Sequence, residues 1–273
     1  MLWNARSICN KTYKLIQALD GVDIAFLTET WLHDNSGLTT NLIKDSGYNL
    51  HRTDRCSRGG GIAILYNNNI ECKSLVFPEH VRASFTSFEH HTVRLITPLV
   101  TYCIICIYRK QKVHVNDFLV EIDTLLDHAT NKLNDTIIVL GDFNIHFDVP
   151  GRATSDAICA LGNYQLRPAV TEPTHNQGHT LDQIFYDIDS LNHQIEPSVS
   201  SDLEDSDHYP IYFTPPNSNE NNIGSKGTTE WISYRRLKQI DIPIFRQSLI
   251  KKPRTMVHQR ARLRQLLRIM CQL

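Results

Sequence analysis

Polar and ionisable residues stand at the ends of several short apolar runs in this sequence. Such positions are where an α/β fold exposes functional groups beside a cleft. Hydrolysis of a phosphodiester needs groups that position water, neutralise charge on the phosphoryl oxygens and assist the leaving oxygen. The residues at these run ends suit those roles, and they are Glu29, Tyr108, Asp142 with Asn144, Asp182, and Asp207 with His208.

A hard divalent cation would supply part of this chemistry. Mg²⁺ prefers oxygen ligands and is usually held by one or two carboxylates together with water and substrate phosphate. Asn4, Glu29 and Asp207 offer such ligands. We therefore expect Mg²⁺, or Mn²⁺ in its place, at these three residues.

The remaining candidates suit proton transfer and contact with the phosphate. Asp142 and Asn144 are two residues apart at the end of an apolar run, a spacing that aims both side chains to the same side of a strand. One of them can orient or deprotonate water while the other donates a hydrogen bond to the phosphate. His208 can contact the phosphate or transfer a proton, and a carboxylate such as Asp182 can fix its tautomer.

Short apolar runs alternate with helical segments and Gly- or Asn-rich turns, a pattern typical of layered α/β architecture. Runs such as 137–140 are apolar throughout, which indicates strands buried on both faces by a second sheet or by helices. We expect strands at 24–28, 61–66, 70–76, 93–97, 102–108, 136–140, 181–186 and 209–214, and helices at 11–19, 116–133 and 155–161.

The cysteines and the remaining histidines favour neither disulfides nor zinc. Cys103 and Cys106 lie in one apolar run, where the period of a strand points them to opposite faces, so we expect buried thiols. Seven cysteines, an odd number, and the lack of an apolar signal segment after Met1 predict an intracellular protein with reduced thiols. Other histidines lack ligand spacing, and we expect surface or loop positions for them, among them His90, His91, His175 and His179.

The near-zero net charge of −1 hides two parts of opposite charge. Residues 1–225 carry 16 Lys and Arg against 27 Asp and Glu, whereas residues 226–273 carry 12 against 2, so their net charges are −11 and +10. We expect a catalytic domain at 1–214, a polar linker at 215–230 and a basic tail at 231–273. The tail either binds nucleic-acid phosphate or is the remnant of a linker.

Taken in order, these motifs resemble the endonuclease/exonuclease/phosphatase superfamily. Within it, they look like the apurinic-type endonuclease domain of non-LTR (LINE-type) retrotransposons, especially the CR1-like and jockey-like groups. The resemblance covers nearly all of residues 1–214 and rests on Asn4, Leu27-Thr28-Glu29-Thr30-Trp31-Leu32, Arg58-Gly59-Gly60-Gly61-Ile62-Ala63, Tyr108-Arg109, Gly141-Asp142-Phe143-Asn144 and Ser206-Asp207-His208-Tyr209-Pro210.

The resemblance implies a four-layered α/β sandwich with two packed mixed β-sheets flanked by helices. It also implies nicking of DNA in the nucleus for target-primed reverse transcription, with element RNA or a reverse transcriptase as further partners. It assigns Asn4 and Glu29 to the metal site, Tyr108 to phosphate contact, Asp142 to water activation, Asn144 to transition-state stabilisation, Asp182 to pairing with His208, and Asp207 to support of the metal or the histidine.

Three departures from the family pattern mark this chain. Lys110 and Gln111 follow Tyr108-Arg109, where the family usually has two prolines, so the local loop should differ in shape. Only three residues precede Asn4, which predicts a weakly anchored first strand. Residues 233–245 look like the start of the connection to a reverse transcriptase, which indicates a fragment or a decayed copy.

Two alternatives remain open beside the DNA-nicking hypothesis. The same fold and metal chemistry can serve abasic DNA, RNA or a small phosphate ester, because loops set the substrate. A non-catalytic, transposon-derived remnant is the other alternative. We interpret Gly59-Gly60-Gly61 as a tight turn leading into a strand and not as a nucleotide site, since no Lys-Ser/Thr follows it.

Overall fold

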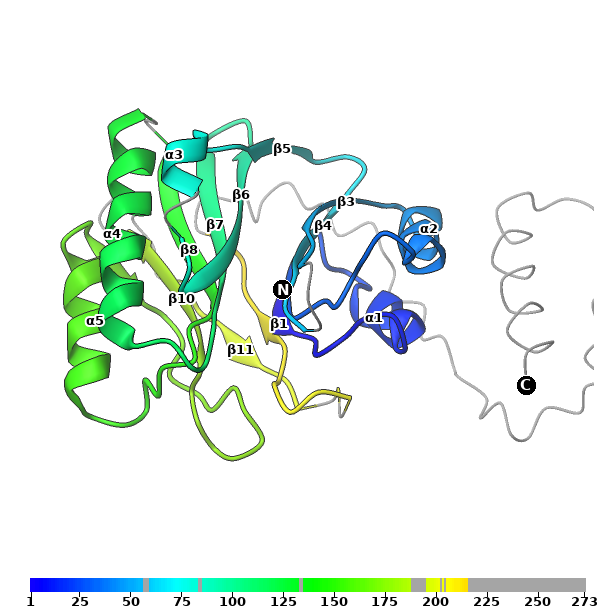
Figure 1. The fold of residues 1–273 in the computed structure, drawn as a ribbon. Helices are drawn as coiled ribbons and strands as arrows, with labels where there is room; N and C mark the ends of the chain where they lie inside the picture. Colours follow the sequence, from blue (N-terminus) through cyan, green and yellow to red (C-terminus); the bar gives the residue numbers. More distant parts are fainter. Residues whose placement is uncertain are drawn as a thin grey trace, which may run out of the picture. The chain divides into compact units, whose positions relative to one another are not determined.

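A computed structural model describes residues 1–55, 59–82, 85–132, 135–187, 195–201, 203 and 205–215. Within these residues, two six-stranded sheets pack against each other and helices cover their outer faces (Figure 1). The expected fold class, a four-layered α/β sandwich with mixed sheets, is confirmed. The predicted linker at 215–230, apart from its first residue, and the basic tail at 231–273 lie outside the described residues. No described helix is long and apolar enough to cross a membrane.

The first sheet contains the start of the chain and is covered by α1 (Thr12–Ala18) and α2 (Gly37–Asp45). β1 runs parallel to β2, and the other neighbours are antiparallel. In spatial order its strands are β11 (Ser198–Val199), β12 (Ile211–Tyr212), β1 (Leu2–Asn4), β2 (Ile24–Thr28), β4 (Ile62–Asn67) and β3 (Tyr48–Thr53).

The expectation of a weakly anchored first strand is wrong. β1 is a central strand, with Leu2 paired to Phe26 on one side and to Ile211 on the other. Leu2, Trp3 and Asn4 are each at most 1% exposed, so three residues suffice because both neighbouring strands hold them.

The second sheet carries the longest strands and packs α4 (Val115–Lys132) and α5 (Arg152–Gly162) on its outer face. The short helix α3 (Glu79–Arg82) precedes its second strand. β7 and β8 are parallel, and the remaining neighbours are antiparallel. In spatial order its strands are β5 (Glu71–Leu75), β6 (Phe88–Ile96), β7 (Thr101–Arg109), β8 (Thr136–Asp142), β10 (Asp182–Asp187) and β9 (Leu166–Pro168).

β7 explains why some runs are apolar throughout. Ile104 and Cys106 face the core between the two sheets, whereas Cys103 and Ile105 face the core under α4 and α5. Both faces of the strand are therefore buried, and the two cysteines point to opposite faces as expected. Burial raises the pKa of the Cys103 thiol to about 12, which keeps it protonated and inert.

The eight expected strands and three expected helices are all present, with shifted ends. The largest shifts are in β6, which begins at Phe88, and in β12, which is only Ile211–Tyr212. His90 and His91 lie inside β6 and are partly exposed, so they are strand residues and not loop residues. The elements that sequence patterns did not indicate are α2, β3, α3, β9 and β11.

Candidate active site

A buried amide at the end of β1 forms hydrogen bonds to both sheets. Asn4 Nδ2 donates to Glu29 Oε1 at 3.0 Å and to Asp142 Oδ2 at 2.8 Å. Glu29 directly follows β2 in the first sheet, and Asp142 ends β8 in the second. A single side chain therefore fixes the separation of two carboxylates that are 113 positions apart in the sequence.

Asp142 is fully buried and held by the residues around it. The backbone N–H of Asn144 donates to Asp142 Oδ1 at 2.8 Å, and Asn144 Nδ2 donates to Asp142 Oδ2 at 3.2 Å. The same amide nitrogen donates to the carbonyl of Arg109 at 2.6 Å, and the Arg109 guanidinium donates to the carbonyl of Asn144 at 3.1 Å. In this arrangement Asn144 positions Asp142.

The glycine before Asp142 is required by the close approach of β7. A Cβ atom on Gly141 would lie 1.9 Å from the carbonyl oxygen of Ile107, and the backbone φ of +143° is one that side chains rarely adopt. Gly141 thus lets Asp142 end the strand beside Tyr108, its partner in the parallel register.

A buried histidine–carboxylate pair lies next to this network. His208 Nδ1 is 2.7 Å from Asp182 Oδ2, and the two side chains are 5% and 1% exposed. The imidazole nitrogen donates, because a carboxylate only accepts. Asp182 begins β10 directly opposite Asp142 in the sheet register, and Trp3 Nε1 donates to the carbonyl of His208 at 3.0 Å.

Burial and mutual charge shift the pKa values of these groups. Burial, together with the neighbouring Asp182, raises the pKa of Asp142 to about 7. Burial alone would lower the pKa of His208, but Asp182, Asp142 and Asp207 raise it to about 9. Burial, followed by the charges of Glu29 and Asp142, raises the pKa of the Tyr108 phenol above its ordinary value of 10.0. At neutral pH the site therefore holds an imidazolium, a neutral phenol and, at Asp142, a carboxyl group whose affinity for a proton is raised.

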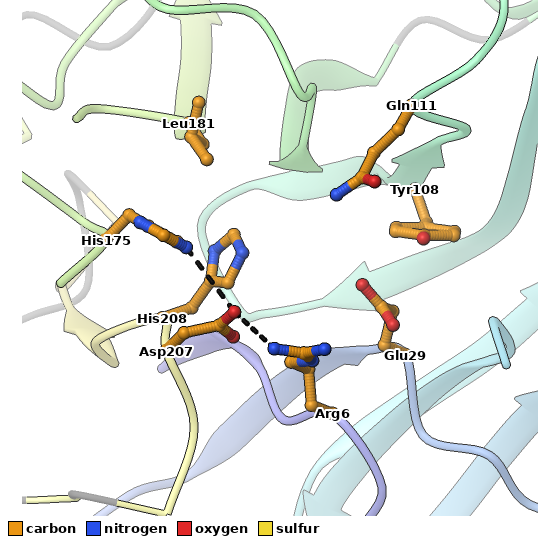
Figure 2. A pocket seen from close by; sticks show the side chains of 8 residues that line it. All are labelled: Arg6, Glu29, Tyr108, Gln111, His175, Leu181, Asp207 and His208. Atoms are coloured by element: carbon orange, nitrogen blue, oxygen red, sulfur yellow. Dashed lines mark hydrogen bonds and ion pairs between the residues drawn. The ribbon is translucent and has the colours of Figure 1, made fainter. Parts of the chain in front are cut away.

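A pocket of about 170 Å³ opens at this place (Figure 2). Four of the expected residues line it, namely Glu29, Tyr108, Asp207 and His208. The other four connect to that lining through hydrogen bonds, Asn4 to Glu29, Asp182 to His208, Asp142 to Asn4, and Asn144 to Asp142. All eight expected residues thus belong to one connected site.

Sequence patterns missed four residues that line the pocket, Arg6, Gln111, His175 and Leu181. Arg6 pairs with Asp207, and His175 Nε2 lies 3.5 Å from the same carboxylate. The rings of His175 and His208 meet edge to face with centroids 4.9 Å apart. The sequence did mark Gln111 as unusual, since it stands where the family usually has proline. It did not mark His175 as a site residue, because only the fold brings the loop of His175 to His208.

Backbone strain gathers at the same place. Of the six residues other than glycine with left-handed φ angles in the part of the chain that the structure describes, five lie in or beside the pocket segments and one, Gln165 (+62°), does not. The five are Arg6 (+41°), Ser7 (+75°), Glu29 (+50°), Trp31 (+54°) and Asn144 (+49°). Residues other than glycine rarely adopt this conformation, and it persists where the surrounding structure imposes it, often at functional sites. The backbone geometry therefore marks the same residues as the hydrogen bonds do.

The donor set fits a cation that prefers oxygen ligands. Glu29 and Asp207 present carboxylates to the pocket. Asp207 Oδ1 is buried and has no hydrogen-bond partner among the described residues, which leaves a charged acceptor unsatisfied. The side chain of Asn4 is already engaged, since its oxygen accepts from Arg6 N at 3.2 Å and its nitrogen donates to both carboxylates. A direct bond from Asn4 to a metal therefore stays a prediction.

Comparisons with known proteins agree with this geometry. The model of the Endonuclease/Exonuclease/phosphatase family matches residues 1–208. Solved structures with a similar fold include the endonuclease domain of TRAS1, a telomere-specific non-LTR retrotransposon, at 16% identity and a TM-score of 0.59, covering 78% of this chain and 94% of that one. An AP endonuclease from Archaeoglobus fulgidus is 16% identical with a TM-score of 0.61, covering 78% and 97%.

A 3' phosphatase, NExo from Neisseria bound to product DNA hairpin, is 15% identical with a TM-score of 0.60, again covering 78% and 97%. Among curated proteins no match was found. At such identities the solved structures establish the fold, while the family match extends over most of the chain. The protein is therefore a member of the Endonuclease/Exonuclease/phosphatase family.

Proposed function

We propose that this protein is a divalent-metal-dependent phosphodiesterase that nicks DNA, as the endonuclease of a LINE-type element does to prime reverse transcription. The observation that carries the proposal is the convergence of Glu29, Asp142 and His208 from separate segments. Asn4 joins Glu29 to Asp142 by hydrogen bonds, and donor atoms of Asp142, Asp182 and His208 lie within 4.8 Å of one another. These groups are a carboxylate for a cation, a proton acceptor of nearly neutral pKa and a buried imidazolium. Phosphodiester hydrolysis needs all three.

Glu29 and Asp207 would hold the cation, with Asn4 keeping Glu29 in place. Mg²⁺ suits these oxygen ligands, and Mn²⁺ can replace it. The bound cation would neutralise charge on the phosphoryl oxygens and on the leaving oxygen. Arg6 also lines the pocket, and its pairing with Asp207 limits how far this carboxylate can turn.

Asp142 is the proposed acceptor of the proton from the attacking water. Its pKa of about 7 gives a substantial carboxylate fraction at neutral pH and still favours uptake of a proton. Asn4 and Asn144 restrict its orientation through three hydrogen bonds between 2.8 and 3.2 Å. The role of Asn144 in stabilising the transition state also stays a proposal, since its amide is turned to Asp142 and Arg109.

His208 and Tyr108 are the proposed donors to the phosphate. His208 is cationic at neutral pH, and Asp182 leaves Nε2 as the nitrogen that is free of this carboxylate. The raised pKa of Tyr108 keeps its phenol protonated, so that it donates a hydrogen bond and adds no negative charge beside the phosphate. Both side chains line the pocket (Figure 2).

Three observations support DNA as the substrate. The fold is shared with a retrotransposon endonuclease domain and with a phosphatase bound to product DNA hairpin. Residues 226–273 carry a net charge of +10, which favours contact with nucleic-acid phosphate. Nuclear location, and element RNA or a reverse transcriptase as partners, follow from the same proposal.

The test is nicking of supercoiled plasmid in Mg²⁺, repeated with EDTA. We expect open-circular product only with the metal, and a rate about 10²–10⁴-fold lower in Asp142→Asn and His208→Ala. Asp45→Asn and His114→Ala, at exposed positions away from the pocket, are the matched controls. Wild-type rates in both site variants would refute the assignment.

A panel of substrates separates the alternatives. Intact duplex, abasic duplex, RNA and a small phosphate ester are offered at equal concentration, since a mannosyl-6-phosphatase from Bacteroides thetaiotaomicron also shares the fold, at 14% identity and a TM-score of 0.57. Preference for intact duplex supports DNA nicking. Preference for another substrate keeps the hydrolase and rejects the DNA role, and no turnover of any substrate supports the non-catalytic remnant.

A further inference from the structure

A second group of potential metal ligands lies outside the pocket. His146 and Asp148 are in the loop that follows β8, and His179 is in the loop that leads into β10. None of the three lines the pocket or takes part in the hydrogen bonds of the catalytic network. One donor atom from each residue lies within 4.8 Å of the donor atoms of the other two.

The three side chains already contact one another. His179 Nδ1 is 3.0 Å from Asp148 Oδ2, and the rings of His146 and His179 meet edge to face with centroids 4.2 Å apart. The second oxygen of Asp148 accepts from the backbone N–H of Thr180 at 2.9 Å. The hydrogen bond from the Thr180 backbone to the Asp148 carboxylate thus orients this carboxylate towards His179.

The backbones that carry these residues are held in register. Phe147 N donates to the carbonyl of Thr180 at 3.0 Å, and Phe143 N donates to the carbonyl of Leu181 at 3.1 Å. Thr154 Oγ1, from α5, donates to the carbonyl of His146 at 2.9 Å. A ligand set on anchored backbone loses less conformational entropy on binding a metal than one on free loops.

Two imidazoles and one carboxylate form a donor set that suits Zn²⁺ and differs from the oxygen ligands of the catalytic pocket. Zn²⁺ bonds of about 2.0–2.1 Å in a tetrahedron require donor atoms roughly 3.4 Å apart. The three donor atoms now lie within 4.8 Å of one another, and rotation of the side chains would bring them to the shorter distance. Room for this rotation exists because His146 is exposed and the His179 and Asp148 side chains are 34% and 26% exposed. Three protein ligands leave the fourth position to water.

We propose that His146, Asp148 and His179 bind Zn²⁺ at a site separate from the catalytic one. The ion clips the loop after β8 to the loop before β10, the two segments that carry Asp142 and Asp182 into the catalytic site. The sequence predicted no zinc site, because His146 and His179 are 33 positions apart and only the antiparallel pairing of β8 with β10 brings them together. The proposal does not depend on the substrate of the enzyme.

The test is calorimetric titration of the full chain, without a histidine tag, with Zn²⁺ in excess Mg²⁺. We expect His146→Ala and His179→Ala, made as separate proteins, each to bind one Zn²⁺ ion fewer than the wild type. His114→Ala should bind the same number as the wild type. Zn²⁺ should also raise the Tm of the wild type and of His114→Ala, and raise it less in both ligand variants. Asp148→Asn, which preserves shape, provides a third variant should either alanine protein unfold.

The catalytic pocket offers a competing explanation, because His175, Asp207 and His208 also lie within 4.8 Å of one another. His175→Ala separates the two. The proposal requires that His175→Ala keep the Zn²⁺ ion that His179→Ala loses. Equal stoichiometry and affinity in wild type, His146→Ala and His179→Ala would overturn it, as would loss of that ion in His175→Ala alone.

Discussion

Replacing Asp182 by asparagine should change the protonation of His208, the proposed phosphate donor, while leaving its surroundings in place. Asp182 Oδ2 accepts from His208 Nδ1 at 2.7 Å, and the pair is almost fully buried. Asparagine has nearly the same shape, but it removes the negative charge that is the main factor raising the pKa of His208. Burial then dominates, and we expect that pKa to fall below its ordinary value of 6.5.

The size of the effect follows from the two pKa values. The difference between 6.5 and about 9 corresponds to about 3 kcal/mol of preferential stabilisation of the imidazolium. Because the folded pKa lies above the unfolded one, this contribution to stability is complete below pH 6.5 and is lost as the pH rises through about 9. The variant should therefore lose most stability at mildly acidic pH, and the two proteins should converge above pH 9.

The catalytic consequence has a defined direction. At neutral pH the variant should lose both the positive charge of the His208 imidazolium and the tautomer that Asp182 fixes. This loss should lower kcat about 10²–10⁴-fold. Asp182 is also the second factor, after burial, that raises the pKa of Asp142. Both limbs of the pH–rate profile should therefore move to lower pH in Asp182→Asn.

NMR titration of the His208 ring in EDTA gives the pKa directly, and urea unfolding at pH 6 and pH 9 gives the stability. Asp45→Asn, on the exposed side of α2, is the matched control. If His208 titrates at the same pH in Asp182→Asn as in the wild type, the reasoning that Asp182 holds the imidazolium is refuted.

Two further predictions concern the framework. Gly141→Ala should destabilise the protein by about 1–3 kcal/mol or more and abolish nicking, since its Cβ would meet Ile107 O at 1.9 Å. Gly162→Ala, in α5 with open space around it, should change the urea midpoint little. Burial alone would raise the pKa of Glu121, but hydrogen bonds from Ser87 and its neighbour Thr86 hold that pKa below 4.5. The resulting stabilisation, at most about 1 kcal/mol at this partly exposed site, is complete above pH 4.5 and lost on acidification. Glu121→Gln should remove this part of the acid dependence of the unfolding free energy.

The layered fold could be predicted because burial on both faces leaves a strong pattern. β7 and β8 read as continuous apolar runs, and α4 repeats apolar residues at helical spacing. β3 was missed because its residues Tyr48–Thr53 are mostly polar and only partly buried. α2 was missed because Thr39 and Ile43 are its only fully buried positions, too few for a recognisable stripe.

The sequence could indicate which candidate residues lie near one another, but not the hydrogen bonds and ion pairs that connect them. Asp142 and His208 stand beside apolar strands, where their types are informative. That Asn4 bridges Glu29 and Asp142 depends on how two sheets pack, and that Arg6 pairs with Asp207 depends on a contact across 201 positions. Neither leaves a local signal, because sequence spacing constrains neighbours within one element only.

A crystal structure with Mn²⁺, located by its anomalous scattering, would show whether Glu29 and Asp207 hold a cation beside Asp142 and His208. We expect an ion in the pocket within bonding distance of Glu29, about 2.1–2.3 Å from a carboxylate oxygen, with Asp142 and Asn4 still joined by their hydrogen bond. A pocket without an anomalous peak at saturating Mn²⁺, or an ion bound only away from Glu29 and Asp207, would contradict it.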